Sequence, residues 1–280
     1  MNLYDAHNHF QDDWLLPHRT AIDADLRAIG LGRAVVNGTS EKDWPVVADL
    51  ARQFDWVQPG FGLHPWDCGN RSPDWQAVLR TQLAAEPSSV VGEIGLDRWI
   101  LDRARPDDSR LAGLRRAPLD EQREVFLWQL ALAAELNRPV SIHCLQAFGA
   151  LHDTLRVTRL PARGFLLHAY SGPAAMVKKF ADLGACFSFN GAFLKERHAA
   201  KREAFKLVPA DRILVETDAP SMPLPVEHNR FTLPPAPDGE PVNHPANLAA
   251  TYAGLAELRG IGIAQLAAQV EQNFLRLFGA

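Results

Sequence analysis

Two histidines, His7 and His9, flank Asn8 in the first apolar segment of the chain. Side chains on a β-strand alternate between its two faces, so residues two apart point the same way. Two buried imidazoles this close both need a polar partner, because leaving them unsatisfied is costly. Ligation of a divalent metal ion satisfies both rings, although an isolated His-X-His pair also fits a purely structural role.

Four further polar residues lie at the ends of later apolar segments. They are Glu93 in VVGEIGLD, His143 in SIHC, His168 in LLHAY and Asp218 in LVETDAP. If these segments are parallel strands of one barrel, their carboxyl ends meet at one mouth. Imidazole and carboxylate ligands suit zinc or manganese, and added water suits magnesium. Six ligands exceed one tetrahedral site and predict two divalent ions (Zn, Mg or Mn), with Glu93 bridging them through its two oxygens.

The apolar segments are rich in Val, Ile, Leu and Phe, as in strands that are buried on both faces. We predict eight strands, over residues 3–9, 33–38, 57–63, 89–96, 139–144, 164–170, 185–189 and 212–217. Helical segments lie between them, among them one that starts at Ser72-Pro73 and one over 119–136. This alternation predicts an α/β fold, a single (β/α)₈ TIM-type barrel domain over residues 1–280. Two C-terminal helices, 246–259 and 263–278, are expected to pack outside the barrel.

Two longer segments break the alternation of strand and helix. Residues 97–118 are charged and follow the fourth strand, and residues 219–242 hold seven prolines and follow the eighth. Both begin at the carboxyl ends of strands, where barrel enzymes place their active-site loops. Segment 97–118 is equally compatible with a solvent-exposed loop that has no role in the site.

Composition and charge narrow the class of protein. Hydrophobic residues make up 47% and charged residues 22% of the chain, which excludes a disordered protein. The three cysteines form no CxxC pair, which excludes a zinc ribbon. No apolar run approaches the roughly 20 residues that span a bilayer, and the first residues do not resemble a signal peptide, so we expect a cytoplasmic protein without a membrane partner. The net charge of −4 excludes capture of nucleic acid by overall charge but leaves local phosphate chemistry open.

The segments DAHNHF, GLHP, GEIGLD, SIH, HAYSG and ETDAP, in this order and spacing, resemble the TatD family of metal-dependent hydrolases. The resemblance covers almost the whole chain, including NHPANL and NFLRLF near its end. It implies an amidohydrolase-like (β/α)₈ barrel with two divalent cations and phosphodiesterase or DNase activity. It also implies six metal ligands, which are His7, His9, Glu93, His143, His168 and Asp218.

The chain departs from the family pattern in the residues that would contact a substrate. The family usually has an arginine two residues after the fifth-strand histidine, where this chain has Leu145, and often a tyrosine where this chain has Ser221. Loss of the arginine weakens bidentate binding of phosphate, so we predict low, metal-dependent activity on DNA ends. Arg98, Arg103 and Arg105 are candidates to reach over the mouth and compensate.

Several other residues are candidates for supporting roles. His64 in GLHP is a candidate contact to the substrate. Glu216 and Asp97 are candidates to hold metal ligands from behind, although Asp97 also fits a loop cap. Trp66 and Trp99 follow strand ends and either stack on a base or pack in the core.

The expected function is metal-assisted hydrolysis, with nucleic-acid ends or a small phosphodiester or ester as substrate. Asp218 and Glu93 are the predicted catalytic residues: Asp218 ligates metal and accepts the proton of the attacking water, and Glu93 bridges the ions. The alternative is a hydrolase of the same fold that acts on a non-nucleic-acid ester, amide or lactone. A third alternative is a binding protein that has lost catalysis, against which the complete ligand set argues.

Overall fold

The computed structural model describes residues 1–236 and 239–279, and within them eight parallel strands form one sheet in sequential order. The strands are β1 (Leu3–Asn8), β2 (Leu31–Asn37), β3 (Val57–Phe61), β4 (Val90–Asp97), β5 (Val140–Leu145), β6 (Phe165–Leu167), β7 (Ala185–Asn190) and β8 (Ile213–Glu216). Beyond β8, the amide of Asp218 donates to the carbonyl of His7 (3.0 Å) and the amide of His9 to that of Ala219 (2.8 Å). These bonds join the eighth strand to the first, which confirms the predicted (β/α)₈ barrel.

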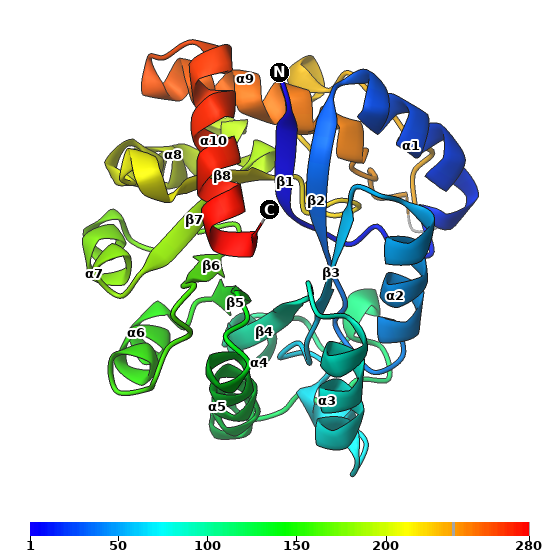
Figure 1. Cartoon of the computed structure of the whole chain (residues 1–280), viewed down its shortest axis with the longest axis vertical. Helices are drawn as coiled ribbons and strands as arrows, with labels where there is room; N and C mark the ends of the chain where they lie inside the picture. Colours follow the sequence, from blue (N-terminus) through cyan, green and yellow to red (C-terminus); the bar gives the residue numbers. More distant parts are fainter. Residues whose placement is uncertain (237–238, 280) are drawn as a thin grey trace.

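Helices surround the ring of strands (Figure 1). They are α1 (Arg19–Ala28), α2 (Trp44–Gln53), α3 (Trp75–Ala85), α4 (Trp99–Asp102), α5 (Leu119–Glu135), α6 (Phe148–Arg156), α7 (Val177–Asp182), α8 (Ala199–Leu207), α9 (Leu248–Arg259) and α10 (Ile263–Phe278). The predicted start of α3 at Ser72-Pro73 is wrong. The hydroxyl of Ser72 accepts from the amide of Asp74 (3.2 Å), so these residues form a turn and the helix begins at Trp75.

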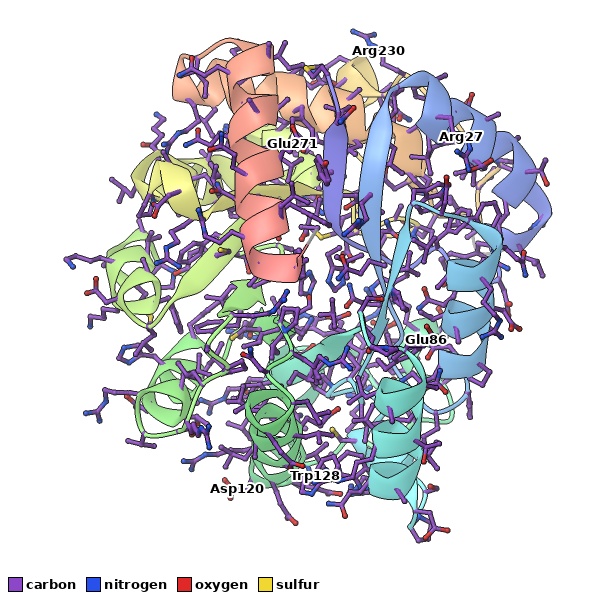
Figure 2. The ribbon with its side chains drawn as sticks, in the orientation of Figure 1. Arg27, Glu86, Asp120, Trp128, Arg230 and Glu271 are labelled. Carbon is purple, nitrogen blue, oxygen red and sulfur yellow. The ribbon has the colours of Figure 1, made fainter. Side chains whose placement is uncertain are left out.

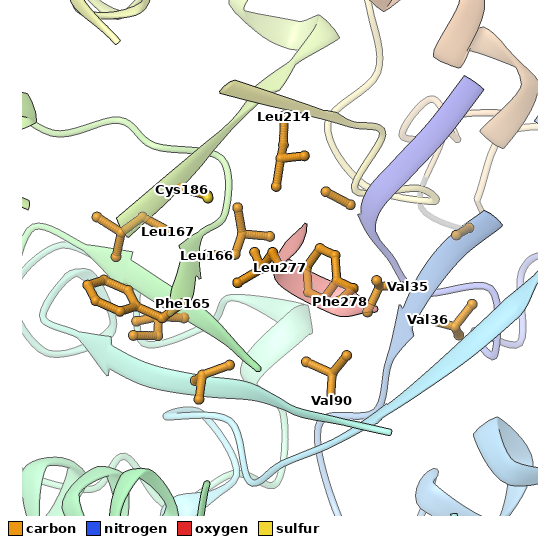
Figure 3. Close-up of a cluster of buried hydrophobic side chains, with 14 of the residues drawn as sticks. Val35, Val36, Val90, Phe165, Leu166, Leu167, Cys186, Leu214, Leu277 and Phe278 are labelled. Carbon is orange, nitrogen blue, oxygen red and sulfur yellow. The ribbon is translucent and has the colours of Figure 1, made fainter. Parts of the chain in front are cut away.

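The two C-terminal helices differ from the expectation that both pack outside the barrel. Helix α9 does lie in the outer ring, against β8 and between α8 and α1 (Figure 1). Helix α10 instead brings Leu277 and Phe278 in among side chains of the strands, including Val35 and Val90 (Figure 3). The carbonyl of Phe278 accepts from Gln58 Nε2 (3.0 Å) near the start of β3. The end of α10 therefore closes the amino-terminal end of the barrel, and the opposite mouth stays open.

The strands are buried on both faces, whereas charged side chains such as Arg27, Asp120 and Arg230 lie on the outer surface (Figure 2). Burial of the apolar strands provides the main stabilisation of the fold, and it holds the carboxyl ends of the strands rigidly around one axis. Across the described residues, we find no helix with the length and apolar character to cross a lipid bilayer.

Candidate metal centre

A cleft of about 690 Å³ opens at the carboxyl-terminal mouth of the barrel. Predicted site residues that line it are His9, His64, Glu93, His143, His168 and Asp218. His7 lies beneath them and is fully buried. The fold therefore brings all seven side chains from three strands and four strand-end loops to one place.

Glu93 stands at the centre of the cluster and divides it into two groups. Its Oε2 atom lies 3.3 Å from Nε2 of His7 and 3.3 Å from Nε2 of His9. Nε2 of His9 also lies 3.4 Å from Oδ1 of Asp218. The donor atoms of His7, His9 and Asp218 converge on one another, and we call these three side chains the first group.

The other oxygen of Glu93 faces a different set. Oε1 lies 2.9 Å from Nδ1 of His143 and 2.8 Å from Nε2 of His168, and these two nitrogens are 3.3 Å apart. We call this set the second group. One carboxylate thus presents one oxygen to each group, which is the geometry that a bridging ligand requires.

The hydrogen bonds behind the imidazoles fit a ligand role. Nδ1 of His9 donates to the carbonyl of Asn37 (2.9 Å), and Nε2 of His143 donates to Oδ2 of Asp97 (3.1 Å). Nδ1 of His7 lies 2.9 Å from the Ser141 hydroxyl and accepts a hydrogen bond from Nδ2 of Asn37 (3.0 Å), so these two residues fix the orientation of the ring. In the neutral form of His9 and His143, the nitrogen that faces Glu93 therefore has no proton and offers a lone pair. The residues present therefore fit divalent metal ions.

His64 also faces Glu93, but with a ring nitrogen that carries a proton. Its Nδ1 accepts a hydrogen bond from the amide of Trp66 (3.2 Å), which places the proton of the neutral ring on Nε2. Nε2 lies 3.4 Å from Oε1 of Glu93. Because this nitrogen is a donor, the geometry supports a contact to Glu93 or to substrate rather than metal ligation.

The carboxylates of the cluster remain ionised although they are buried. Burial alone would raise the pKa of Glu93, but nearby imidazoles, His168 foremost, hold this pKa well below its usual value. Burial also opposes ionisation of Asp218, and the hydrogen bond from His9 lowers its pKa below the usual value. Burial likewise opposes a charge on His143, but neighbouring carboxylates raise its pKa to about 9. Both acids are therefore ionised near neutral pH, and the pocket favours positive charge.

The backbone at the end of β8 is unusual where it delivers Asp218. Asp218 has φ +53°, in the left-handed region that non-glycine residues seldom adopt. Such a conformation costs about 1–3 kcal/mol and persists only where the surroundings enforce it. Here Asp5 accepts hydrogen bonds from the amide (3.0 Å) and hydroxyl (2.6 Å) of Thr217, which fixes the preceding residue.

Asp5 is one of several supporting residues that sequence reasoning missed. Two others are Gln122 and Gln129 on α5, seven residues apart and both fully buried. Gln122 bonds the amide (2.8 Å) and carbonyl (3.0 Å) of Asp97, and Gln129 bonds the amide (2.7 Å) and carbonyl (3.1 Å) of Leu63. Each glutamine clamps a strand end that carries a site residue. In the sequence, two glutamines seven residues apart on the apolar face of a helix could have indicated these supports.

The two candidates for a role behind the ligands have different contacts. Asp97 bonds His143, as above, and its Oδ1 also accepts from the amide of Ile100 (3.1 Å), so it both supports the imidazole and caps α4. Glu216 lies 3.7 Å from Nδ1 of His168, beyond hydrogen-bonding distance. Its carboxylate instead accepts from the Ser188 hydroxyl and from Asn190 Nδ2 (3.2 Å).

The predicted compensating arginines do not reach the cleft. Arg98 pairs with Asp102 (2.9 Å) and Arg105 with Asp107 (3.6 Å), and within the described residues neither these two nor Arg103 lines the cleft. Ion pairs within their own segment hold both side chains away from the mouth. The basic residues that do line the cleft are Lys42 and Lys201, which sequence reasoning missed.

The loop segments contribute unequally to the mouth. Pro220, Ser221 and Met222 of segment 219–242 line the cleft, as does Leu145 at the end of β5. Residues 237 and 238 of that segment lie outside the described residues. Segment 97–118 supplies Asp97 behind His143 and Trp99 behind Trp66, so it supports the site from one side.

An α/β barrel whose open mouth gathers imidazoles and carboxylates in two groups defines the class of metal-dependent hydrolases. Within that class, the profile of the family described as "TatD related DNase" matches residues 4–279. The chain belongs to this family.

Individual relatives agree with this placement. The 3'-5' ssDNA/RNA exonuclease TatD of Escherichia coli K12 is 32% identical over 257 residues, covering 89% of this chain and 88% of its own. An uncharacterized metal-dependent hydrolase of Bacillus subtilis, YabD, is 26% identical and covers 99% of this chain and 98% of its own. The crystal structure of YJJV, a TatD homolog from E. coli K12, superposes with a TM-score of 0.83 at 28% identity, covering 99% of this chain and 98% of that one. These relatives do not favour the alternative of a non-nucleic-acid ester, amide or lactone substrate.

Proposed function

We propose that the protein is a metal-dependent phosphodiesterase that hydrolyses the ends of nucleic-acid strands at a centre for two divalent ions, Zn, Mg or Mn. His7, His9 and Asp218 would hold one ion, His143 and His168 the other, and Glu93 would bridge. The proposal rests on the position of Glu93, whose two carboxylate oxygens face separate groups of donors. Residues 1–280 would form one domain, which the family match over 4–279 supports.

Bound divalent ions supply a nucleophilic water at neutral pH and neutralise negative charge on the phosphoryl group. Asp218 lines the cleft and is held ionised, so it can accept a proton from the attacking water. His64 presents its Nε2 proton toward the centre and can donate it to a phosphoryl oxygen. Lys42 and Lys201 line the same cleft and add positive charge for the substrate backbone.

Nucleic acid as the substrate class is supported by the family description and by the name of the E. coli relative, a 3'-5' ssDNA/RNA exonuclease. A small phosphodiester remains within the same chemistry, because the donor cluster recognises the phosphodiester group itself. The cytoplasmic location stays a prediction.

The test is a substrate panel on protein loaded with Zn²⁺, Mg²⁺ or Mn²⁺. We expect removal of terminal nucleotides from single-stranded oligonucleotides, loss of activity in chelator and recovery on adding metal back. Glu93→Gln, which removes the bridging charge, should abolish turnover while circular dichroism shows a retained fold. Turnover of simple esters or lactones but of no phosphodiester would contradict the proposal.

A further inference from the structure

Two tryptophans stack on one side of the mouth. Trp66 follows β3 and Trp99 opens α4 after β4. Their ring centroids lie 6.1 Å apart with an interplanar angle of 23°. Trp66 is half-buried and lines the cleft, whereas Trp99 is absent from the cleft lining as far as the structure describes the chain. The Arg110 guanidinium lies over both rings, 5.1 Å from the Trp99 centroid and 5.9 Å from the Trp66 centroid, and the His64 ring packs edge-on against Trp66 (5.7 Å). Trp99 and Arg110 therefore support a ring that lines the cleft.

The indole of Trp66 is fixed in place. Its Nε1 donates to Oδ2 of Asp97 at 2.6 Å, and its backbone amide donates to Nδ1 of His64 at 3.2 Å. A ring held by a buried carboxylate loses little freedom when a flat ligand packs on it, so it is pre-organised for binding. Core packing alone does not require that the ring face an open cleft.

The same carboxylate ties the indole to the metal-ligand cluster. Asp97 accepts from Nε2 of His143 (3.1 Å) as well as from Trp66. Leu145 pairs with Asp97 in the register of β4 and β5 and also lines the cleft. This side of the mouth therefore offers aromatic and aliphatic surface next to the donor cluster, with Arg110 over the two indoles, and an indole that lines the cleft suits a base.

One of the two lysines of the cleft lies across the mouth from Trp66. Lys201 lines the cleft with its Nζ 4.8 Å from the centroid of the Phe193 ring, and both residues follow β7. Strands β3 and β7 are four apart in an eight-stranded barrel, so Trp66 and Lys201 face each other from opposite sides. A strand whose phosphodiester lies at Glu93 would meet an aromatic surface on one side and a cation on the other.

We propose that Trp66, supported by Trp99, is the stacking platform for the nucleobase next to the scissile phosphodiester. This inference rests on the proposed function and deepens it, because it makes the base of an end nucleotide a recognised part of the substrate. Stacking on an aromatic face is tolerant of base identity, so the platform selects for a base without selecting its sequence.

The experiment compares a single-stranded oligonucleotide with two probes that lack the bases of their last few nucleotides, one at the 3' end and one at the 5' end. The kcat/KM of metal-loaded protein is measured on each, and affinity is measured by fluorescence anisotropy in chelator, where no turnover occurs. Base stacking contributes about five- to 150-fold in affinity, so wild type should prefer the full strand over one of the probes by that factor.

Three variants separate stacking from structure. Trp66→Leu should lose the preference for the full strand, and any loss on the abasic probes should be matched by Trp66→Phe, which lacks the same bond to Asp97. Trp66→Phe, which keeps a ring but loses the bond to Asp97, should retain most of the preference. Trp128→Leu is the matched control, because Trp128 also belongs to an aromatic pair with an arginine over its ring, but lies among the outer helices (Figure 2). It should behave as wild type.

The outcomes distinguish the subsite from the proposed function. If wild type removes nucleotides from full and abasic ends equally well, or Trp66→Leu weakens both to the same degree, the platform is wrong and the phosphodiesterase stands. Equal losses of the preference for the full strand in Trp66→Phe and Trp66→Leu would assign the effect to the Asp97 bond and overturn stacking. Failure of wild type to hydrolyse any phosphodiester would refute the proposed function itself.

Discussion

Asp97→Asn tests whether the hydrogen bond behind His143 sets the properties of the second group. Oδ2 of Asp97 accepts from Trp66 Nε1 (2.6 Å) and His143 Nε2 (3.1 Å), and Oδ1 accepts from the amide of Ile100 (3.1 Å). An asparagine has a single oxygen, so its amide group must face donors on one side. The buried site can resolve that conflict by moving the proton of His143 from Nε2 to Nδ1, the nitrogen that faces Glu93.

The expected magnitude follows from the bond that is lost. A hydrogen bond to a charged group contributes about 1.5–3 kcal/mol, and loss of a partner behind a ligand typically costs about 10- to 100-fold in metal affinity. We therefore expect the affinity of the second group for Zn²⁺ or Mn²⁺ to fall about 10- to 100-fold. The first group does not contact Asp97 and should keep its affinity within a few-fold.

The assay is calorimetric titration of metal-free protein, with the tautomer of His143 followed by ¹⁵N NMR above its pKa of about 9, where the ring is neutral. Asp23→Asn is the matched control, because Asp23 also accepts from an indole, Nε1 of Trp56 (2.7 Å), but lies on α1. It should leave both affinities unchanged. Equal losses in the two groups, or an unaltered tautomer with weakened binding, would refute the reasoning.

Four further outcomes are expected. His7→Ala combined with His9→Ala should lower metal occupancy at one of two sites, as measured by elemental analysis of folded protein purified without chelator. Asp218→Asn should reduce turnover at least about 10²–10⁴-fold, with the fold retained by circular dichroism; near-normal rates with metal bound would show that Asp218 is not the base. Leu145→Arg should raise activity on oligonucleotides by restoring a bidentate phosphate contact, and brisk wild-type cleavage with no gain would show that the replacement is neutral. Despite burial, neighbouring carboxylates raise the pKa of His143 to about 9, so metal binding at pH 7 should release a proton and affinity should rise with pH up to that value; calorimetry in buffers of different ionisation enthalpy measures this.

The fold was accessible from the sequence because its signal is local. Each strand is a short apolar run that is buried on both faces, so its place in the chain was predictable. Its ends were less so: the sixth strand was predicted over 164–170 and spans Phe165–Leu167. Alternation of strands with helices then selects the barrel. The end of α10 was misplaced because Leu277 and Phe278 belong to an ordinary amphipathic stripe, and nothing in such a stripe states which surface it covers.

The donor cluster was also accessible, since polar residues at the ends of buried strands converge by topology alone. Its supports were not, because they depend on contacts between segments far apart in the chain. Asp5 accepts hydrogen bonds from Thr217 where the eighth strand meets the first, and Gln122 hydrogen-bonds the backbone of Asp97. The prediction for the arginines of segment 97–118 was wrong for a different reason. Arg98 pairs with Asp102 one helical turn away, and this local ion pair competes with a position across the mouth.

The charge distribution explains how a chain of net charge −4 would work on nucleic acid. Within the described residues, Lys42 and Lys201 are the basic side chains of the cleft, and its wall also carries Asp12, Asp13 and Asp67. A surface of this kind neutralises few phosphates, so it cannot hold a long strand by its backbone. Affinity must then come from a few contacts at one point, the phosphodiester at the donor cluster and a base beside it. Such contacts are satisfied by the end of a strand as fully as by its middle, and an end enters the open mouth of the barrel without bending the chain on both sides.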